Sequence, residues 1–283
     1  MPHKSSPILE FKDVSLRYED TWALHNVSFA LRPGETRIIL GAAGSGKTTL
    51  LKAVIGLVEV DHGNIELFGE EVTSRKEHDL YPLRSRAGIL FQEGGLFDSL
   101  SVGENVEYPL LNQQTSDHRL EDSPSLEAEA EKRVREALKF VELEQTFDKS
   151  PSELSGGMRR RVGIARAIVT EPPLILYDSP TAGLDPITAN TIMAVIAKER
   201  DVRNTASLIV TNRYQDGELM ANFRFDPEKE ELVPVSEEEQ NDPGRSRTKF
   251  LVMKAGEFVF FGTRHELESS DDEYVKRFVR RED

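Results

Sequence analysis

A glycine-rich octapeptide, Gly41-Ala-Ala-Gly44-Ser-Gly46-Lys47-Thr48, is the part of this sequence best suited to chemistry. Glycines at this spacing let the main chain curl so that several N–H groups point toward one phosphate. Lys47 would place a cation between the β- and γ-phosphates, and the Thr48 hydroxyl would face Mg²⁺. The segment therefore predicts a P-loop that binds ATP with Mg²⁺. The remaining polar side chains of this predicted site are Ser45 and Thr49.

Two further segments could complete a phosphate site. The apolar run 174–177 is followed directly by Asp178. A carboxylate at the end of an apolar strand is costly unless something binds it, and a water held by Mg²⁺ is its natural partner. Ser155-Gly156-Gly157 opens a predicted helix, where the serine can cap the first turn and the glycines let a phosphate approach the amides.

The predicted elements around these residues alternate between strands and helices. A strand at 37–40 enters the P-loop and a helix at 47–57 leaves it, which is the context that a P-loop requires. Strands at 174–178 and 206–211 flank a helix at 188–200, and this alternation predicts a mainly parallel sheet. Period-two patterns typical of strands also occur at 9–11, 14–16 and 27–31. The runs 250–253 and 258–261 are expected to form a hairpin around Gly256.

The element Leu154-Ser-Gly-Gly-Met158, downstream of the P-loop, resembles the signature of the ATP-binding-cassette (ABC) transporter ATPases. The resemblance extends over about residues 8–213. It implies an α/β P-loop NTPase of the ABC cassette type, with a mainly parallel core sheet, an N-terminal antiparallel β part and an inserted helical lobe. We expect one domain over 1–283, divided into a nucleotide-binding core (1–92 and 171–213), a helical lobe (93–170) and a C-terminal extension (214–283).

The resemblance also implies roles for individual residues. The segment Ser155–Gly157 is expected to reach the γ-phosphate bound on the opposite subunit, which implies a homodimer with two ATP molecules between the subunits. Gln92 matches the glutamine that senses the γ-phosphate and the metal, beside Thr48 and Asp178. Asp185, in Ala182-Gly-Leu-Asp185-Pro, matches a loop that bridges the two ATP sites.

An aromatic side chain is expected to stack on the adenine ring. Tyr18 matches the family's position for this residue, and Trp22 is a nearby competitor. Packing within the N-terminal sheet would account for either ring equally well.

Two positions depart from the family pattern. Ser179 stands where the family has a glutamate that polarises the attacking water, and Asn212 stands where it has a switch histidine. The loss of a positioned base typically costs ~10²–10⁴ in rate. Glu93 and Asp185 are carboxylates that could substitute. The chain is therefore expected to bind ATP, and to be either a slow ATPase or a hydrolysis-impaired clamp or regulator gated by ATP.

The stretch 87–110 resembles the ATPase subunits of phospholipid transporters of the Mla and Mce type. The likeness implies phospholipid transport through a separate integral-membrane permease, whose short helix would enter a groove beside Gln92. An importer for another substrate, such as an amino acid or an ion, is the alternative, and a soluble cassette protein acting on ribosomes or DNA is disfavoured. The expected walls of the groove are Leu96, Phe97, Leu100 and Val102.

The composition limits the partners of the chain. A net charge of −14 argues against binding nucleic acid by neutralising its phosphates. No window approaches the roughly 18 consecutive apolar residues that span a bilayer, and the first residues lack the apolar core of a secretory signal. With no cysteine, thiol chemistry is excluded. We expect a cytoplasmic protein that inserts nowhere in the membrane but lies peripherally on its inner face, held by the permease.

An acidic segment at 216–247 stands apart from the family pattern. Its charge and composition are typical of a solvated loop or a partly disordered insertion. A regulatory or partner-docking role is the alternative.

Overall fold

The computed structural model describes residues 6–92, 94–113 and 124–279, and its centre is a six-stranded sheet. Five of the strands run parallel, because strand–helix–strand connections return each strand in the same direction, and only the last strand is antiparallel. In spatial order the strands are β12 (Glu257–Gly262), β11 (Thr248–Lys254), β3 (Thr36–Gly41), β8 (Ala206–Thr211), β7 (Leu174–Asp178) and β6 (Ala87–Leu90).

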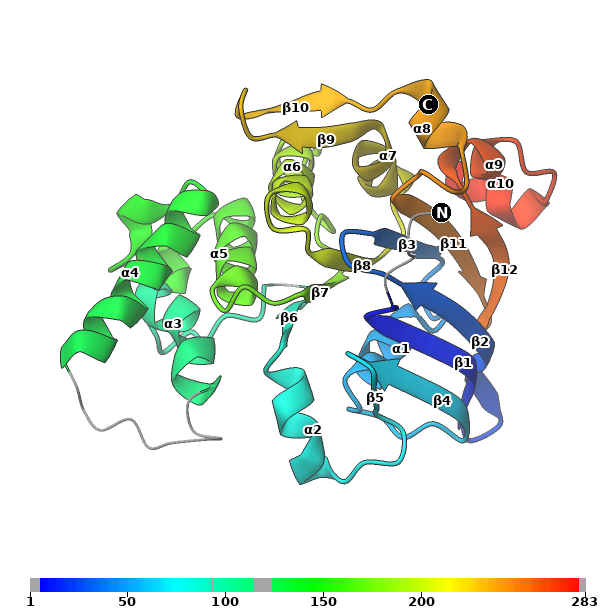
Figure 1. Ribbon diagram of the computed structural model, residues 1–283, viewed down its shortest axis with the longest axis horizontal. Coiled ribbons are helices and arrows are strands. Elements are labelled where there is room, and N and C mark those ends of the chain that lie inside the picture. The colour runs from blue at the N-terminus through cyan, green and yellow to red at the C-terminus, as the bar shows by residue number, and fades with distance from the viewer. Residues whose placement is uncertain (1–5, 93, 114–123, 280–283) are drawn as a thin grey trace.

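A second, antiparallel sheet faces the first and encloses α1 (Lys47–Val54) between them (Figure 1). Alternate residues of the central strands point to opposite faces. Ile39 and Leu208 therefore pack toward α1, whereas Ile38 and Ile209 pack toward the helices of the other face. The strands of the second sheet, in spatial order, are β2 (Thr21–Leu31), β1 (Leu9–Tyr18), β4 (His62–Leu67) and β5 (Glu70–Glu71).

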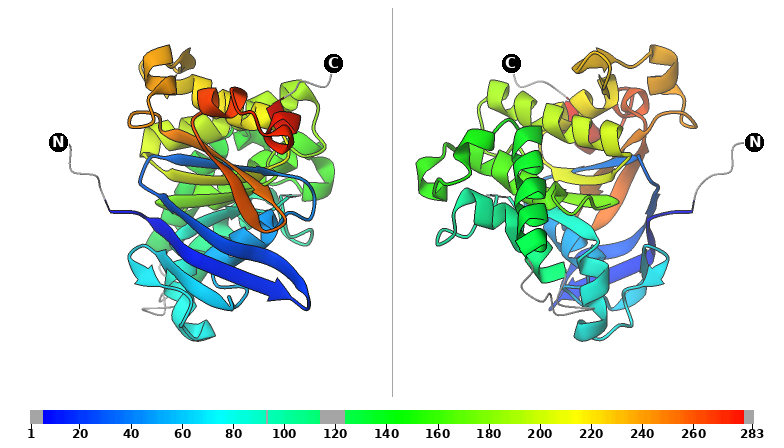
Figure 2. Two further views of the ribbon diagram at one scale, coloured as in Figure 1. Left: turned by 90° about the vertical axis from the view of Figure 1, so that its right-hand side faces the viewer. Right: turned by 60° about the vertical axis from the view of Figure 1, so that its left-hand side comes forward.

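Helices and one two-stranded hairpin form most of the rest of the described residues. One group lies to the side of the central sheet as a lobe, as the turned views show (Figure 2). The lobe comprises α3 (Val102–Gln113), α4 (Pro124–Phe140) and α5 (Gly156–Ile168), and the neighbouring α2 (Glu77–Arg84) precedes β6. The others are α6 (Pro186–Arg203), α7 (Tyr214–Asn222), α8 (Glu237–Asn241), α9 (Arg264–Glu268) and α10 (Glu273–Val279).

The expected fold class is confirmed, including the antiparallel N-terminal part and the helical lobe. The strands at 174–178 and 206–211 have the predicted bounds. The strands predicted at 9–11 and 14–16 are parts of one continuous strand, β1. Its pairing with β2 shifts in register between Phe11 and Val14, at a bulge where Asp13 has a left-handed backbone conformation. Such a bulge hides the continuity of a strand from a period-two pattern.

The expectation of a loop or a partly disordered insertion at 216–247 is wrong, although the acidic side chains at 228, 230, 231, 237 and 238 are exposed, as expected of a solvated segment. The segment continues α7, forms the hairpin of β9 (Phe223–Asp226) and β10 (Glu231–Pro234), and ends with α8. Its anchor is Arg200 of α6, a residue that is 2% exposed and whose guanidinium donates to the main-chain carbonyls of Met220 (2.9 Å) and Phe223 (3.1 Å). The charge composition of the segment did not indicate this order, because the buried ion pair that holds the segment in place lies outside it.

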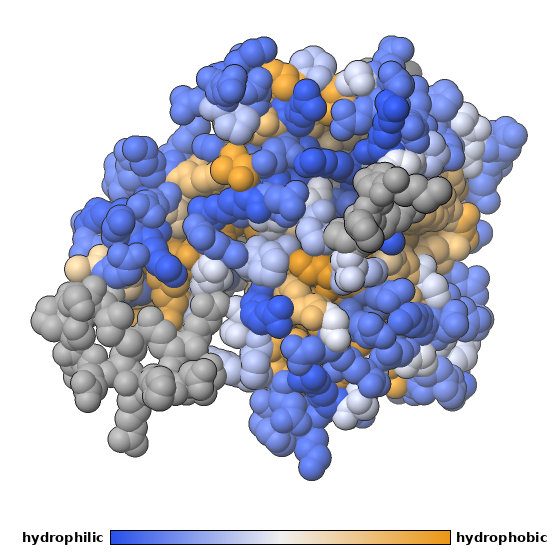
Figure 3. All heavy atoms as spheres, viewed as in Figure 1, coloured by the Kyte–Doolittle hydropathy of each residue, from blue (hydrophilic) through white to orange (hydrophobic). Residues whose placement is uncertain are grey.

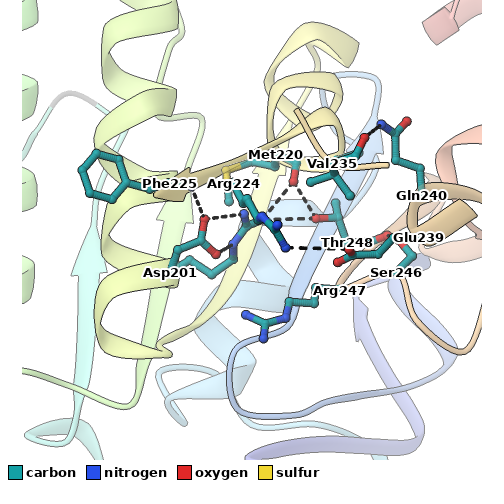
Figure 4. Close-up of a pocket in the computed structure, with 12 residues that line it drawn as sticks. Asp201, Met220, Arg224, Phe225, Val235, Glu239, Gln240, Ser246, Arg247 and Thr248 are labelled. Atoms are coloured by element: carbon teal, nitrogen blue, oxygen red, sulfur yellow. Dashed lines mark hydrogen bonds and ion pairs between the residues drawn. The ribbon is translucent and has the colours of Figure 1, made fainter. Parts of the chain in front are cut away.

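Asp201 completes the anchor, as the close-up of the surrounding pocket shows (Figure 4). Its two carboxylate oxygens accept from Nε and Nη2 of Arg200, each at 2.8 Å, and one of them also accepts from the amide of Phe225 at 2.8 Å. The two side chains therefore neutralise each other's charge, and the same carboxylate also accepts a main-chain amide of β9, the first strand of the hairpin.

The face seen in Figure 3 is largely hydrophilic, with hydrophobic residues in smaller areas between the polar ones. Among the helices of the described ranges, none combines the length and the apolar character needed to cross a membrane.

We predict that Asp201→Ala lowers the free energy of unfolding by about 3 kcal/mol, because it leaves the buried Arg200 guanidinium without its counter-charge. Urea titration would measure the change. Glu131→Ala is the matched control, since it removes the partner of Arg135 from an exposed pair on α4 and should change stability little. Equal effects of the two substitutions would contradict the anchor assigned to Asp201.

Candidate nucleotide-binding site

The P-loop connects the end of β3 to the start of α1. Gly44 and Gly46 have positive φ angles of 76° and 107°, which L side chains rarely adopt. A Cβ on Gly46 would lie 2.1 Å from the carbonyl oxygen of Ala23 in β2, so that only glycine fits there. No side chain caps the first turn of α1. Its amides, together with the helix dipole, are therefore available to an anion.

The ammonium of Lys47 lies inside this loop. Its Nζ donates to the carbonyls of Gly41 (2.7 Å) and Ala42 (2.8 Å) and to the hydroxyl of Ser45 (3.3 Å). Burial lowers the pKa of Lys47, and the charge of Asp178 opposes this shift. Ser45 is itself buried and supports the loop from within.

The hydroxyl of Thr48 donates to Oδ2 of Asp178 at 3.0 Å. Thr48 lies in the first turn of α1, which follows β3 through the P-loop, and Asp178 ends β7, two strands away from β3 in the parallel sheet. The second oxygen of the carboxylate accepts from the Ser179 hydroxyl at 3.1 Å. A hydroxyl and a carboxylate beside a P-loop are oxygen ligands of the kind that Mg²⁺ takes, so these residues fit that ion.

A pocket of about 490 Å³ opens over the P-loop. It brings together nine of the residues expected at the site: Tyr18, Gly44, Gly46, Lys47, Thr48, Thr49, Gln92, Ser179 and Asn212. Five more line it: Thr21, Trp22, Ala23, Ala43 and Ala182. The polar and charged residues gather at the P-loop end, and the aromatic rings come from β1 and β2.

The two aromatic candidates differ in their surroundings. Trp22 is stacked on His25, with ring centroids 4.9 Å apart, and the guanidinium of Arg17 lies over its ring at 5.4 Å. Tyr18 is 52% exposed, and no ring stacks on it within the described residues. This geometry favours Tyr18 as the ring that is free to stack on a base.

The positions that depart from the family pattern both line the pocket and follow neighbouring strands, Ser179 after β7 and Asn212 after β8. Ser179 has a positive φ of 49°, and the main chain around it is held on both sides. Its amide donates to the carbonyl of Val210 (2.8 Å), and its carbonyl accepts from Arg160 (2.7 Å). Asn212 is exposed just after β8.

Neither of the carboxylates considered as substitutes is placed at this pocket. Asp185 caps α6, accepting from the amides of Ile187 (3.1 Å) and Thr188 (3.0 Å). The Thr188 hydroxyl and these amides hold the pKa of Asp185 below its usual range. Glu93 lies outside the described residues.

The motif Ser155-Gly156-Gly157 lies away from the P-loop pocket of its own chain, because none of its residues lines that pocket. The Ser155 hydroxyl accepts from the amide of Met158 at 3.2 Å and so caps α5. Ser155 and Gly156 are exposed, whereas a Cβ on Gly157 would meet Thr188 of α6 at 2.5 Å. The capped helix end is therefore exposed at a place apart from this pocket.

An apolar groove of about 460 Å³ lies between α2, β6, α3 and α5. Four aromatic side chains that are more than a third exposed line it: Tyr81, Phe91, Phe97 and Tyr108. Of the four walls expected from the sequence, only Phe97 is among the lining residues. Val102 is fully buried in the hydrophobic core and Leu96 packs against that core, because helical packing in the lobe takes up both side chains. Leu100 is half-buried and lies outside the groove.

Sequence reasoning missed two arginines of α5. Arg160 donates to the carbonyls of Ser179 (2.7 Å) and Ala182 (2.8 Å), and Arg166 donates to those of Gly95 (2.8 Å) and Gly94 (2.9 Å). Both are buried. Buried and exposed arginines occur at similar positions along a helical sequence, so the sequence does not indicate that these two are buried.

We predict that Gly46→Ala weakens ATP binding by more than ~10-fold, since the new methyl group collides with the Ala23 carbonyl and the loop must move. Isothermal titration with ATP would measure the loss. Gly69→Ala is the control: Gly69 also has a positive φ, of 78°, but its Cβ would meet nothing within 4 Å. That variant should lose about 1 kcal/mol of stability and keep its ATP affinity. Unchanged binding by Gly46→Ala would refute the assigned fit.

Comparison with known proteins matches residues 24–182, more than half of the chain, to the family described as ABC transporter. The methionine import ATP-binding protein MetN of Brucella abortus is 37% identical over 211 residues, 75% of this chain and 54% of that protein. The chain thus spans about half the length of this relative. The intermembrane phospholipid transport ATP-binding protein MlaF of Escherichia coli K12 is 34% identical over 75% of this chain and 76% of its own length.

Solved structures are similar over nearly the whole chain. A dimeric post-hydrolysis state of the ATP-binding cassette MJ0796, bound to ADP and Pi, has a TM-score of 0.72 at 28% identity and covers 90% of this chain and 98% of its own. The cbiO1 protein of Clostridium perfringens, part of the cbiONQ complex, has a TM-score of 0.72 at 28% identity, over 97% of this chain and 95% of its own. The chain therefore belongs to the ABC transporter family, as an ATP-binding cassette domain.

Proposed function

We propose that this chain binds and slowly hydrolyses ATP as one half of a homodimer, and so drives phospholipid transport through a separate membrane permease. One observation carries the ATPase part: the P-loop and Thr48 line one pocket and Thr48 is hydrogen-bonded to Asp178, while the Ser155 motif presents a second phosphate-type surface elsewhere on the molecule. A second copy would bring that surface to the pocket.

Each part of the pocket has a task in this proposal. The P-loop amides and Lys47 hold the β- and γ-phosphates, and Tyr18 stacks on the adenine. Thr48, Asp178 and Gln92 would hold Mg²⁺, which supplies charge neutralisation at the phosphates. Division into the parts 1–92 with 171–213, 93–170 and 214–283 fits this assignment, since the pocket draws its residues from the first of these.

Hydrolysis is slow in this proposal because, among the described residues, no carboxylate lines the pocket, and Asp178 at the end of β7 is already engaged by two hydroxyls. The Ser179 hydroxyl donates to Asp178, and a serine hydroxyl is not itself a base at neutral pH, so it supplies no general base for the attacking water. An ATP-gated clamp is the second candidate, favoured by Ser179 and Asn212.

The phospholipid assignment rests on the stretch 87–110 and on the likeness to MlaF over three quarters of both chains. The likeness to MetN supports an amino-acid importer as the competing assignment. The aromatic groove beside β6 suits a short amphipathic helix of a permease, because exposed aromatic rings bury large apolar areas in such contacts. The chain would then work at the inner face of the cell membrane without entering it.

Steady-state turnover tests the motor against the clamp. We predict that the native protein hydrolyses ATP above the level of Lys47→Ala, and that Ser179→Glu combined with Asn212→His raises the rate by at least ~10². ATP affinity should stay the same in the repaired protein, because neither residue belongs to the phosphate cradle. Native turnover equal to that of Lys47→Ala, with activity only in the repaired protein, would favour the clamp.

Reconstitution tests the substrate. In proteoliposomes containing the chain and its co-purified permease, ATP should drive transfer of a fluorescent phospholipid and not uptake of radiolabelled methionine. Phe97→Asp should abolish co-purification by placing a charge in the groove, while ATP binding persists. Val202→Asp, at a residue that is 46% exposed on α6, is the matched control. Methionine uptake without lipid transfer would replace the proposed substrate.

A further inference from the structure

A buried carboxylate joins the two loops that carry the altered catalytic positions. Asp216, in the first turn of α7, is 1% exposed and does not line the nucleotide pocket. The hydroxyl of Thr181 lies 2.8 Å from each of its two oxygens, and the hydroxyl of Thr211 donates to it at 2.7 Å. Thr181 belongs to the loop after β7, and Thr211 ends β8. One side chain thus binds both loops.

The connection continues into the main chain. The Thr211 hydroxyl accepts from the amide of Arg213 at 3.1 Å, and the guanidinium of Arg213 donates back to the carbonyl of Thr181 at 3.3 Å. Asn212 therefore stands between two residues of this network. On the other loop, Thr181 immediately precedes Ala182, which also lines the pocket.

Such a link needs a reason, because a buried carboxylate is costly. Burial raises the pKa of Asp216, and only the hydroxyls of Thr211 and Thr181 and the charge of Arg213 oppose that shift. Apolar side chains could fill the same space, but they would not set a distance and direction between the loops as hydrogen bonds do. The arrangement suits a place where two backbones must keep one spacing.

We propose that Asp216 is a positioning residue: through Thr181 and Thr211 it sets the spacing of the loops 179–182 and 211–213 across the phosphate end of the pocket. This inference rests on the proposed function. With neither a glutamate at 179 nor a histidine at 212, the attacking water depends on groups of these loops that are already in place. The network then governs the reaction of bound ATP and leaves ATP binding to the P-loop.

The test removes one hydroxyl at a time. Thr181→Val and Thr211→Val keep the shape of the side chain and lose its hydrogen bond to Asp216. Each should lower kcat about 10-fold or more while the Kd for ATP stays within about 2-fold, since small displacements near a reaction affect rate more than binding. Thr205→Val is the control, because Thr205 is equally buried and donates to the carboxylate of Glu199 at 3.2 Å, away from the pocket.

Two further variants separate positioning from general destabilisation. Thr211→Ser keeps the hydroxyl and should recover most of the turnover lost by Thr211→Val. The double variant Thr181→Val/Thr211→Val should lose little more than either single variant, because both act through one carboxylate. A kcat loss in Thr205→Val equal to that in Thr181→Val, at equal loss of melting temperature, would overturn the inference.

The failure of the proposed function gives a different result. If the native protein hydrolyses ATP no faster than Lys47→Ala, the proposed ATPase activity is wrong. The role of Asp216 is then tested by ATP-induced dimerisation, measured by sedimentation. Thr181→Val and Thr211→Val should then weaken that dimer about 10-fold relative to Thr205→Val, with ATP affinity of the monomer retained. Valine variants that keep native turnover, or native dimerisation where turnover is absent, would overturn the role of Asp216.

Discussion

The hydrogen bond between Thr48 and Asp178 is the contact on which the site depends. It joins residues 130 positions apart in the chain, and it forms because β3 and β7 run parallel in one sheet with β8 between them. Parallel strands deliver their carboxyl ends to the same edge, where a helix N-terminus and a carboxylate can face one phosphate. A shift of either strand by one residue would reverse the faces of its side chains and dismantle the site.

The packing of α1 makes this edge rigid. The helix is enclosed between the central sheet and the antiparallel sheet, and Gly46 lies against the Ala23 carbonyl of β2. The P-loop is therefore shaped by a strand that contributes no phosphate ligand of its own. The same strand carries Trp22 to the pocket, so that the N-terminal sheet both supports the loop and completes the wall.

The Ser155 motif and the P-loop pocket lie in different parts of the fold but are linked by one helix, α5. Arg160 of α5 holds the loop after β7 through the carbonyls of Ser179 and Ala182, so the helix that presents the motif also braces the pocket. Asp216 holds the same loop through the hydroxyl of Thr181. The loops that carry Ser179 and Asn212 thus belong to a framework that is fixed by several hydrogen bonds. A rigid framework is what a site needs when its chemistry relies on orientation more than on a base.

Local patterns determined a large part of this protein. The P-loop, the strand that ends in Asp178 and the cap at Ser155 are short segments whose geometry follows from their own residues, and all of them could be predicted from the sequence. The tertiary structure decided the rest. The burial of Val102, the anchoring of 216–247 by Arg200 and the pairing of Asp216 with Thr181 and Thr211 depend on contacts between segments far apart in the chain. An acidic or basic residue looks the same in sequence whether it is solvated or buried with a partner, because only the folded chain brings that partner to it.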